Sequence, residues 1–259
     1  MIIDSHRHLV RSEDEKDFYS AKKVFLDDLK VNGISKCIVI ADNVENSTTA
    51  DTQNLIEIFA NNEDIKIVGA LNPFGDLEKQ SEYFGSLLRL KKIIALKMFN
   101  GFDELFPTDE RCFTSYRLAE EYNIPVIFHT GAGTGDETAQ YNDPKYIVEI
   151  AKKLPNLKIV ISHFYWPKIK YCLELTKNVE NIYYDTTVLA DEDVISEIGS
   201  IEKIQDVLVE CIAVKPSNLI FGSDFPACKT TPAIELINGL KISQSEKNNI
   251  FSENSKLIF

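Results

Sequence analysis

The chain has 259 residues, of which 44% are hydrophobic and 26% are charged, a composition typical of a globular protein that can bury a sizeable core. Its formal net charge is −12, from 28 Lys and Arg against 40 Asp and Glu, and no basic stripe offsets the surplus. Nucleic acid and anionic membranes are therefore excluded as expected partners, and no apolar run reaches the length of a membrane span.

The cysteines and the N-terminus both bear on the cellular compartment. Five cysteines, an odd number without a CxxC pair, favour reduced thiols over a disulfide framework. The N-terminus lacks the basic start and the apolar core of a signal peptide. We therefore expect a cytoplasmic protein.

Short β-branched runs recur along the whole chain and alternate with longer amphipathic stretches. Their spacing is roughly 30 residues, which is the period of a β/α unit with parallel crossovers. The predicted strands are Ile2–Ser5, Ser35–Ala41, Ile65–Leu71, Ile93–Phe99, Pro125–Thr130, Leu157–Ser162, Asn181–Thr186 and Leu219–Ser223.

The amphipathic stretches predict helices between these strands. Phe18, Ala21, Phe25 and Leu29 form one apolar stripe that ends at Gly33. Several other stretches begin at a residue that can cap a helix N-terminus. Further helices are expected after Asp51, Asp76, Asp109, Asp143–Pro144, Trp166, Asp191 and Thr231.

Eight β/α units in a chain of this length predict a closed (β/α)₈ TIM barrel, with residues 1–259 as a single domain. The alternative is an open doubly wound sheet. It would need a glycine-rich phosphate turn after the first strand, where this chain has His6-Arg7-His8.

All four histidines and one aspartate stand where a predicted strand meets a turn: His6, His8, His129, His163 and Asp224. His6 and His8 are two residues apart and therefore share one face of a strand. Imidazole nitrogen and carboxylate oxygen are ligands of zinc, and they also suit iron, cobalt or manganese. The sequence therefore predicts a metal site at the carboxyl rim of the barrel, where barrel enzymes carry their chemistry.

The fourth predicted strand carries a lysine on its interior face. Ile94, Leu96 and Met98 form the bulky apolar face expected to meet the helices, which leaves Lys97 pointing inward with Ala95. A free ammonium inside a barrel is costly unless it faces an anion. A carboxylate or phosphate of the substrate would supply that anion.

This order of strand-end residues resembles the amidohydrolase superfamily of metal-dependent hydrolases. The resemblance is closest to its branch of small single-domain hydrolases and decarboxylases, which includes aminocarboxymuconate semialdehyde decarboxylase. It covers essentially the whole chain. The matching stretches are Ile3–His8, Phe106–Asp109, Ile124–Gly131, Ile161–His163, Phe221–Pro226 and Ile250–Leu257, the last of which resembles the closing helix of the family.

The resemblance implies that His6, His8, His129 and Asp224 hold one divalent ion, most simply Zn²⁺. Such a site leaves a position open for water, whose pKa falls to about 7 when it is bound. Asp224 would take the proton of this water and pass it to the leaving group. His163 would act beside the ion as a catalytic residue, or as a ligand of a second ion.

Three roles are possible for Lys97. Binuclear members of the superfamily carry a carboxylated lysine on the fourth strand that bridges two ions. Single-metal relatives carry a plain lysine in this region, and the third alternative is a lysine that only reaches the rim to solvate its charge. We favour a plain lysine that binds an anionic group of the substrate.

Three neighbouring features have structural alternatives. Trp166 is predicted to line the substrate pocket, and packing against the adjacent loop is the alternative. The glycine-rich stretch 130–135 is predicted to be a loop over the site. Arg7 lies between two candidate ligands, so strand alternation points it away from the ion, toward packing or an acidic partner outside the barrel.

Three functions follow as hypotheses. The first is a metal-dependent hydrolase of a small ester, lactone or amide that bears an anionic group. The second is a non-oxidative decarboxylase of an unsaturated or aromatic carboxylic acid, and the third is a non-catalytic barrel that binds a ligand. A small-molecule substrate is the expected partner in the first two, and a homo-oligomer is compatible with the sequence.

Overall fold

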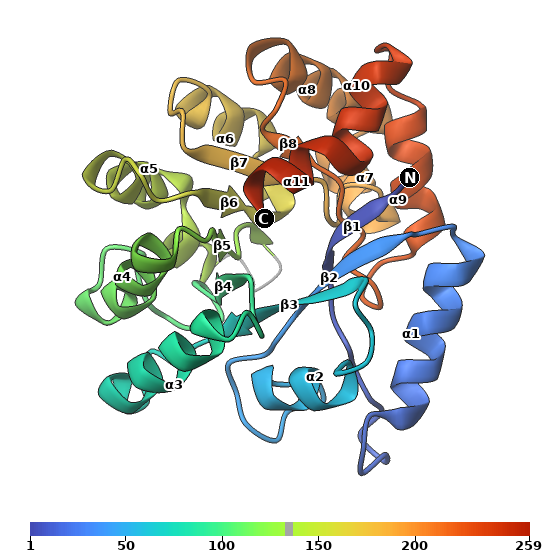
Figure 1. Cartoon of the computed structure of the whole chain (residues 1–259). Helices are drawn as coiled ribbons and strands as arrows, with labels where there is room; N and C mark the ends of the chain where they lie inside the picture. The colour runs from blue at the N-terminus through green and yellow to red at the C-terminus, as the bar shows by residue number, and fades with distance from the viewer. Residues whose placement is uncertain (133–136) are drawn as a thin grey trace.

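The structure is a computed structural model, which describes residues 1–132 and 137–259. Part of the predicted glycine-rich loop, residues 133–135, lies outside the described residues. Eight parallel strands form one sheet in chain order, and helices surround it (Figure 1). The strands are β1 (Ile3–Arg7), β2 (Lys36–Ile40), β3 (Ile65–Ala70), β4 (Ala95–Met98), β5 (Val126–Phe128), β6 (Ile159–Ile161), β7 (Ile182–Asp185) and β8 (Leu219–Ile220).

The first strand closes the sheet against the segment that follows the last strand. The amide of Ser5 donates to the carbonyl of Phe221 (2.9 Å), and Arg7 forms a parallel bridge with Phe225. This closure confirms the predicted (β/α)₈ barrel. β8 is shorter than predicted because the Phe221 amide donates to the carbonyl of Ile250 (3.0 Å) instead of continuing the ladder with β7.

A helix or a short helical segment follows most strands, and the predicted aspartate caps at Asp51, Asp76, Asp143 and Asp191 each accept a backbone N–H of the first turn. Among the described residues, no helix is both long enough and apolar enough to cross a membrane. The α-helices are α1 (Tyr19–Val31), α2 (Thr52–Ile58), α3 (Leu77–Arg89), α4 (Phe113–Tyr122), α5 (Pro144–Lys153), α6 (Ile169–Thr176), α7 (Glu192–Ile198), α8 (Ile201–Val214), α9 (Thr230–Asn238), α10 (Gln244–Asn248) and α11 (Asn254–Ile258). The short segments are the 3₁₀ turns η1 (Glu110–Cys112), η3 (Ala139–Asn142) and η4 (Ser162–Tyr165) and the π-helical η5 (Asn249–Glu253).

One helix is predicted after Asp191, and the structure has two. α7 ends at Ile198 and is followed by Gly199, whose φ of 107° only a glycine adopts without strain. The side chain of Ser200 then caps the start of α8.

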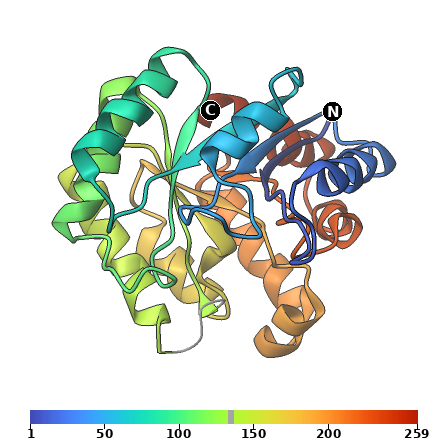
Figure 2. The same cartoon turned by 90° about the horizontal axis from the view of Figure 1, so that it is seen from below.

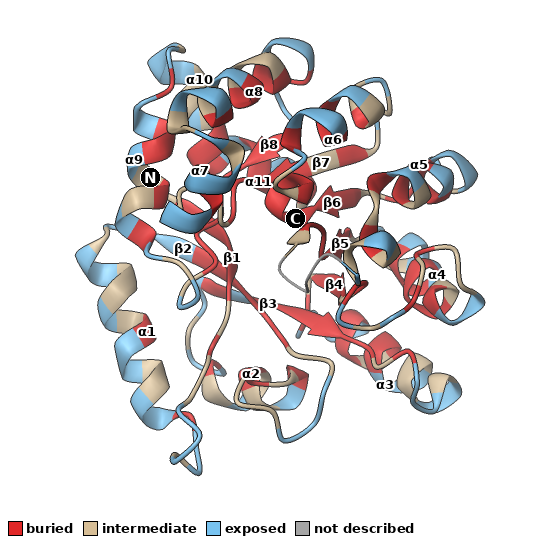
Figure 3. Ribbon diagram, turned by 180° about the vertical axis from the view of Figure 1, so that it is seen from behind, coloured by how far each residue is buried: buried red, intermediate tan, exposed pale blue. Residues whose placement is uncertain are grey.

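The strands bury both of their faces, as Figure 3 shows in red. Leu96 and Met98 belong to the clusters beneath the helices, and Ala95 belongs to the barrel interior, as predicted. Ile94 differs: it packs against the interior cluster, because β4 starts only at Ala95 and the alternation does not extend to Ile94. The interior cluster consists of Ile38, Ile40, Val68, Ala95, Ile127, Val160, Ile220 and Ile258.

The C-terminal helix closes the end of the barrel at which the strands begin. Ile258 of α11 joins the interior cluster, and the Asn254 side chain donates to the carbonyl of Leu219, the first residue of β8 (2.8 Å). Both chain termini lie at this end (Figure 2). The opposite end is therefore the one available for a site.

Candidate metal centre

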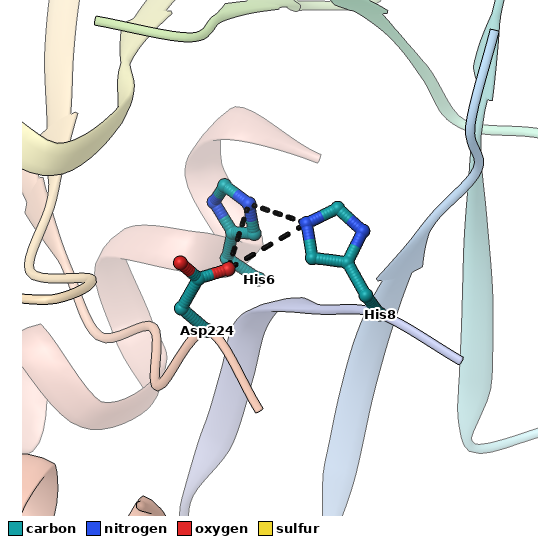
Figure 4. Close-up of side chains that lie close together, drawn as sticks. All are labelled: His6, His8 and Asp224. Carbon is teal, nitrogen blue, oxygen red and sulfur yellow. Dashed lines mark hydrogen bonds and ion pairs between the residues drawn. The ribbon is translucent and has the colours of Figure 1, made fainter. Parts of the chain in front are cut away.

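Three potential metal ligands converge at the open end of the barrel. His6 lies in β1 and His8 directly follows it, and their Nε2 atoms are 3.3 Å apart. Asp224 follows β8, and its Oδ1 is 3.7 Å from Nε2 of His6 and 3.5 Å from Nε2 of His8 (Figure 4). All three ligand atoms lie within 4.8 Å of one another, so one ion could contact all of them.

The barrel closure holds Asp224 in this position. Its backbone amide donates to the carbonyl of His6 (2.9 Å), and its φ of 65° is left-handed, which aspartate tolerates better than most residues. The preceding residue is also tied to β1. Asp4 accepts the Ser223 amide at 2.9 Å and the Ser223 hydroxyl at 2.6 Å.

Arg7 packs on the other side of β1 from the two histidines. Its guanidinium lies between the rings of Phe25 and Phe225, 4.9 and 4.3 Å from their centres, and pairs with Asp4 (3.0 Å) and Asp28 (2.6 Å). Arg7 is fully buried. The expected pairing with acidic groups away from the site is confirmed.

The other ring nitrogen of His6 and that of His8 each have a partner. Nδ1 of His6 is 2.8 Å from Oδ2 of Asp185 at the end of β7, and Nδ1 of His8 is 3.1 Å from the carbonyl of Ile40. A carbonyl or a carboxylate can only accept, so both Nδ1 atoms carry the proton in these contacts. Both Nε2 atoms then present lone pairs toward Asp224, which is the arrangement that metal-binding histidines need.

Burial and charge set the protonation of these groups. Burial lowers the pKa of His8 well below its usual value, and the neighbouring His6 and Lys97 add to the effect. Burial alone would raise the pKa of Asp185, but its interactions with His6, His163 and Thr187 hold this pKa well below the usual value. A neutral imidazole is the form that binds a metal.

His129 and His163 form a second pair beside the three-ligand group. Nε2 of His163 is 3.1 Å from Nδ1 of His129, and Nδ1 of His163 is 4.0 Å from Oδ2 of Asp224. Burial lowers the pKa of both histidines well below the usual value. The Nε2 atom of His129 is buried and has no hydrogen-bond partner among the described residues. Such an orphaned nitrogen is expected at a metal site.

Asp224 itself is buried, which raises its pKa; Asp185 and Asp4 act in the same direction, while His6 and Lys97 oppose the shift. A nearby cation would favour its charged form.

Lys97 lies inside the barrel, as strand alternation predicted, and is 1% exposed. Its ammonium is 3.4 Å from the hydroxyl of Ser162, and none of the described carboxylates lies within 4 Å of it. Burial lowers the pKa of Lys97 to about 8, although Asp185 and Asp224 act in the opposite direction. This amine therefore lacks a direct anionic partner within the described part of the protein.

These groups open into a cavity of about 440 Å³. Its apolar wall includes Phe102, whose ring centre is 4.8 Å from that of His129. Charged and polar groups share the same cavity. The lining residues are His8, Val10, Asp42, Asn43, Val44, Thr49, Lys97, Phe99, Phe102, Asp103, His129, His163, Asp224, Pro226 and Ala227.

The family model described as amidohydrolase matches residues 3–259. The chain belongs to the amidohydrolase family. The family is one of enzymes and lies in a metal-dependent superfamily, so the resemblance found in the sequence is confirmed at this level.

Solved structures share the fold of this amidohydrolase at low sequence identity. An uncharacterised TIM-barrel protein from Bordetella bronchiseptica has a TM-score of 0.80 at 17% identity, covering 99% of this chain and 97% of that one. A probable 2-pyrone-4,6-dicarboxylic acid hydrolase from Acinetobacter baumannii, with citric acid bound, has a TM-score of 0.69 at 17% identity, covering 99% and 98%. A 5-carboxyvanillate decarboxylase from Novosphingobium aromaticivorans, complexed with manganese and 4-hydroxy-3-methoxy-5-nitrobenzoic acid, has a TM-score of 0.69 at 12% identity, covering 99% and 95%. No curated protein matches the sequence.

The structure of this amidohydrolase brings the predicted site residues together to different degrees. His6, His8 and Asp224 form one group, and His129 and His163 lie beside it. Trp166 is not among the described residues that line the cavity. It lies against Gly131, where an added β-carbon would be 2.8 Å from the Trp166 carbonyl, so its role in substrate binding stays a prediction.

Asp185 is the residue that the sequence reasoning missed in this amidohydrolase. It is 1% exposed and contacts His6, His163 and Thr187. A signal was present, because Asp185 lies next to the end of the predicted strand Asn181–Thr186, close to a strand end as the histidines and Asp224 are, and it is the last residue of β7.

Proposed function

We propose that this chain is a metal-dependent hydrolase of a small carbonyl compound, an ester, lactone or amide, that carries an anionic group. The observation that carries the proposal is the convergence of His6, His8 and Asp224 beside a cavity of about 440 Å³, which His8, Asp224 and Lys97 line. A cavity of this size suits a small molecule.

The donor set fits one zinc ion. His6, His8 and Asp224 would hold it, and His129 would complete the set through the Nε2 atom that lacks a protein partner. Three imidazoles and one carboxylate are an open catalytic set rather than a closed structural one. When bound, such an ion polarises a carbonyl group and makes water a stronger acid.

Asp224 and His163 are the proposed catalytic residues. The Asp224 carboxylate contacts His8 through one oxygen and His163 through the other, so it can accept a proton during attack and return it to the leaving group. His163 lines the same cavity and would handle a proton or the developing negative charge of the substrate.

Lys97 would bind the anionic group of the substrate as a plain, uncarboxylated lysine. The absence of a direct carboxylate partner among the described residues supports this role, because an anion would compensate the buried ammonium. Carboxylation of Lys97 with two ions is the competing arrangement, and it predicts a different metal content.

The apolar wall favours one second candidate, a non-oxidative decarboxylase of an unsaturated or aromatic acid. Phe99 and Phe102 line the cavity with rings 6.4 Å apart, which suits a flat, unsaturated ligand. The decarboxylase from Novosphingobium aromaticivorans shares the fold. The same metal ligands would orient the acid, and Asp224 or His163 would deliver the proton.

The test combines metal analysis with product analysis on the zinc-reconstituted protein, using a panel of lactones, esters and aromatic acids. We expect one zinc per chain and hydrolysis of an anionic substrate, and carbon dioxide release would replace hydrolysis by the second candidate. Less than about one-tenth equivalent of metal after reconstitution would favour a non-catalytic barrel.

Two variants sharpen this test. Asp224→Asn is expected to lower turnover by about 10³-fold or more, the scale on which removal of a proton-transferring group acts. Lys97→Met is expected to keep one zinc and to raise KM at least about tenfold, the effect of losing roughly 1.4 kcal/mol of binding. Two zinc ions in the wild type that fall to one or none in Lys97→Met would reject the plain lysine.

A further inference from the structure

A row of hydrogen bonds runs across the ends of three neighbouring strands. Asp185 ends β7, Thr187 follows it, His163 follows β6 and His129 follows β5. The Thr187 hydroxyl donates to Oδ1 of Asp185 and lies 2.7 Å from Nδ1 of His163, whose Nε2 is 3.1 Å from Nδ1 of His129. All four side chains are at most 8% exposed, so water does not compete for these contacts.

The donor in each of these hydrogen bonds can be assigned in turn, starting from Asp185 at one end of the row. An ionised carboxylate only accepts, so the single hydroxyl proton of Thr187 points to Asp185. The Thr187 oxygen can then only accept from His163, and Nδ1 of His163 must carry a proton.

The same logic extends to His129. With Nδ1 of His163 protonated, the lone pair of its neutral ring is on Nε2, which faces Nδ1 of His129. Nδ1 of His129 is then the donor, and the lone pair of His129 is on Nε2, the buried atom without a partner among the described residues. That is the atom through which His129 would hold an ion.

Packing fixes the hydroxyl of Thr187 in place. A β-carbon added at Gly222 would lie 2.8 Å from the Thr187 methyl and 3.0 Å from Cβ of His6, so the methyl occupies the space that this glycine leaves. A β-branched side chain has few alternative rotamers. Asp185 is fixed in turn by the backbone amides of His163 (3.0 Å) and Thr187 (3.2 Å).

We propose that Thr187 and Asp185 are positioning residues that fix a proton on Nδ1 of His163, so that Nε2 of His163 accepts from Nδ1 of His129 and His129 keeps Nε2 free for the ion. The part that concerns His129 rests on the proposed metal site, whereas the part that concerns His163 does not. β7 would thus act on the site although it supplies no ligand.

The test is the ring tautomer of His163, read from long-range ¹H–¹⁵N spectra of the full chain with and without zinc. The chain has only four histidines, and a His163→Gln sample assigns the signal. We expect an Nδ1-protonated ring in the wild type and in Thr187→Ser, which keeps the hydroxyl. Thr187→Val keeps the shape and removes the hydroxyl, and we expect it to shift His163 toward the Nε2-protonated form.

Zinc affinity provides a second readout, measured by competition with a chelator. Removing a direct hydrogen-bond partner of a metal ligand usually weakens metal binding about 10- to 100-fold. Thr187 acts on His129 through His163, so we expect Thr187→Val to weaken zinc binding by about 10-fold, the lower end of this range, and Thr187→Ser to restore it to within a few-fold. Thr186→Val is the matched control, because the neighbouring hydroxyl bonds the backbone of Gly222 and, among the described residues, no histidine.

An unchanged tautomer in Thr187→Val, or the same change in Thr186→Val, would overturn the inference. Failure of the proposed function would give a different experimental result from failure of this inference. A wild type that binds no zinc would reject the metal site, while the tautomer of His163 is still measured in the metal-free protein.

Discussion

Asp103 is a partly buried carboxyl group in the wall of the cavity. Its Oδ2 accepts a hydrogen bond from the Asn43 amide at 2.8 Å. Burial raises the pKa of Asp103 to about 6, with a contribution from Asp42, although the Asn43 bond acts in the opposite direction. The folded state therefore binds more protons than the unfolded state between pH 4 and 6, and stability from this group is lost as pH rises through 6.

Asp103→Asn removes the cost of burying a charged carboxylate and keeps an oxygen that can accept from Asn43. We expect the variant to melt at a higher temperature than the wild type above pH 6 and at the same temperature near pH 4, measured by circular dichroism. Glu104→Gln, an exposed neighbour, controls for the loss of one negative charge. A difference that is equal at all pH values would contradict the assignment.

The most useful sequence signal for the site was the position of candidate ligands at the ends of predicted strands. The strand-end placement of His6, His8 and Asp224 predicted a group that the structure brings together. The protons on these rings could not be predicted, because they depend on partners that are distant in the chain. Nδ1 of His6 bonds Asp185, which is 179 positions away, and Nδ1 of His163 bonds Thr187.

At the scale of elements, the contact between β1 and the segment after β8 closes the barrel and also holds Asp224, a proposed ligand, in place. Asp4 links the two, because it pairs with Arg7 and accepts both the amide and the hydroxyl of Ser223. Asp4 and Arg7 are both fully buried. Removing one partner of a buried pair leaves an uncompensated charge in the interior.

Asp4→Ala is therefore expected to lower the free energy of unfolding by about 3–5 kcal/mol, measured by urea denaturation. The control is Asp64→Ala, which breaks an exposed pair with Lys36 and should cost less than about 1 kcal/mol. Equal losses in the two variants would show that the buried pair does not stabilise the closure.

The strands were predictable as elements because buried parallel strands are continuous β-branched runs. Their ends were less predictable. β8 ends early because Phe221 bonds η5, a contact between segments that no local pattern encodes. The division of α7 from α8 depends on Gly199 and Ser200, a stop and a start signal that the sequence contains but that the prediction of one helix overlooked.

At the scale of the whole molecule, one end of the barrel is sealed and the other is open. Ile258 is 1% exposed and completes the interior cluster from α11. Ile258→Ala is expected to lower the free energy of unfolding by about 2–5 kcal/mol and to leave zinc affinity unchanged, measured by denaturation and chelator competition. Leu257→Ala, at an adjacent side chain that is 64% exposed, should cost less than about 0.5 kcal/mol. Similar losses in both variants would contradict the sealing role of Ile258.

The proposed ligands come from opposite ends of the chain, His6 and His8 near its start and Asp224 in its last unit. A ribosome therefore releases the two histidines long before the aspartate that completes their group. A nascent chain holds at most half of the proposed four-ligand set until its fifth strand is made, and the proposed set would be complete only once Asp224, after β8, has been made. Capture of the ion would then report that the segment after β8 has closed on β1.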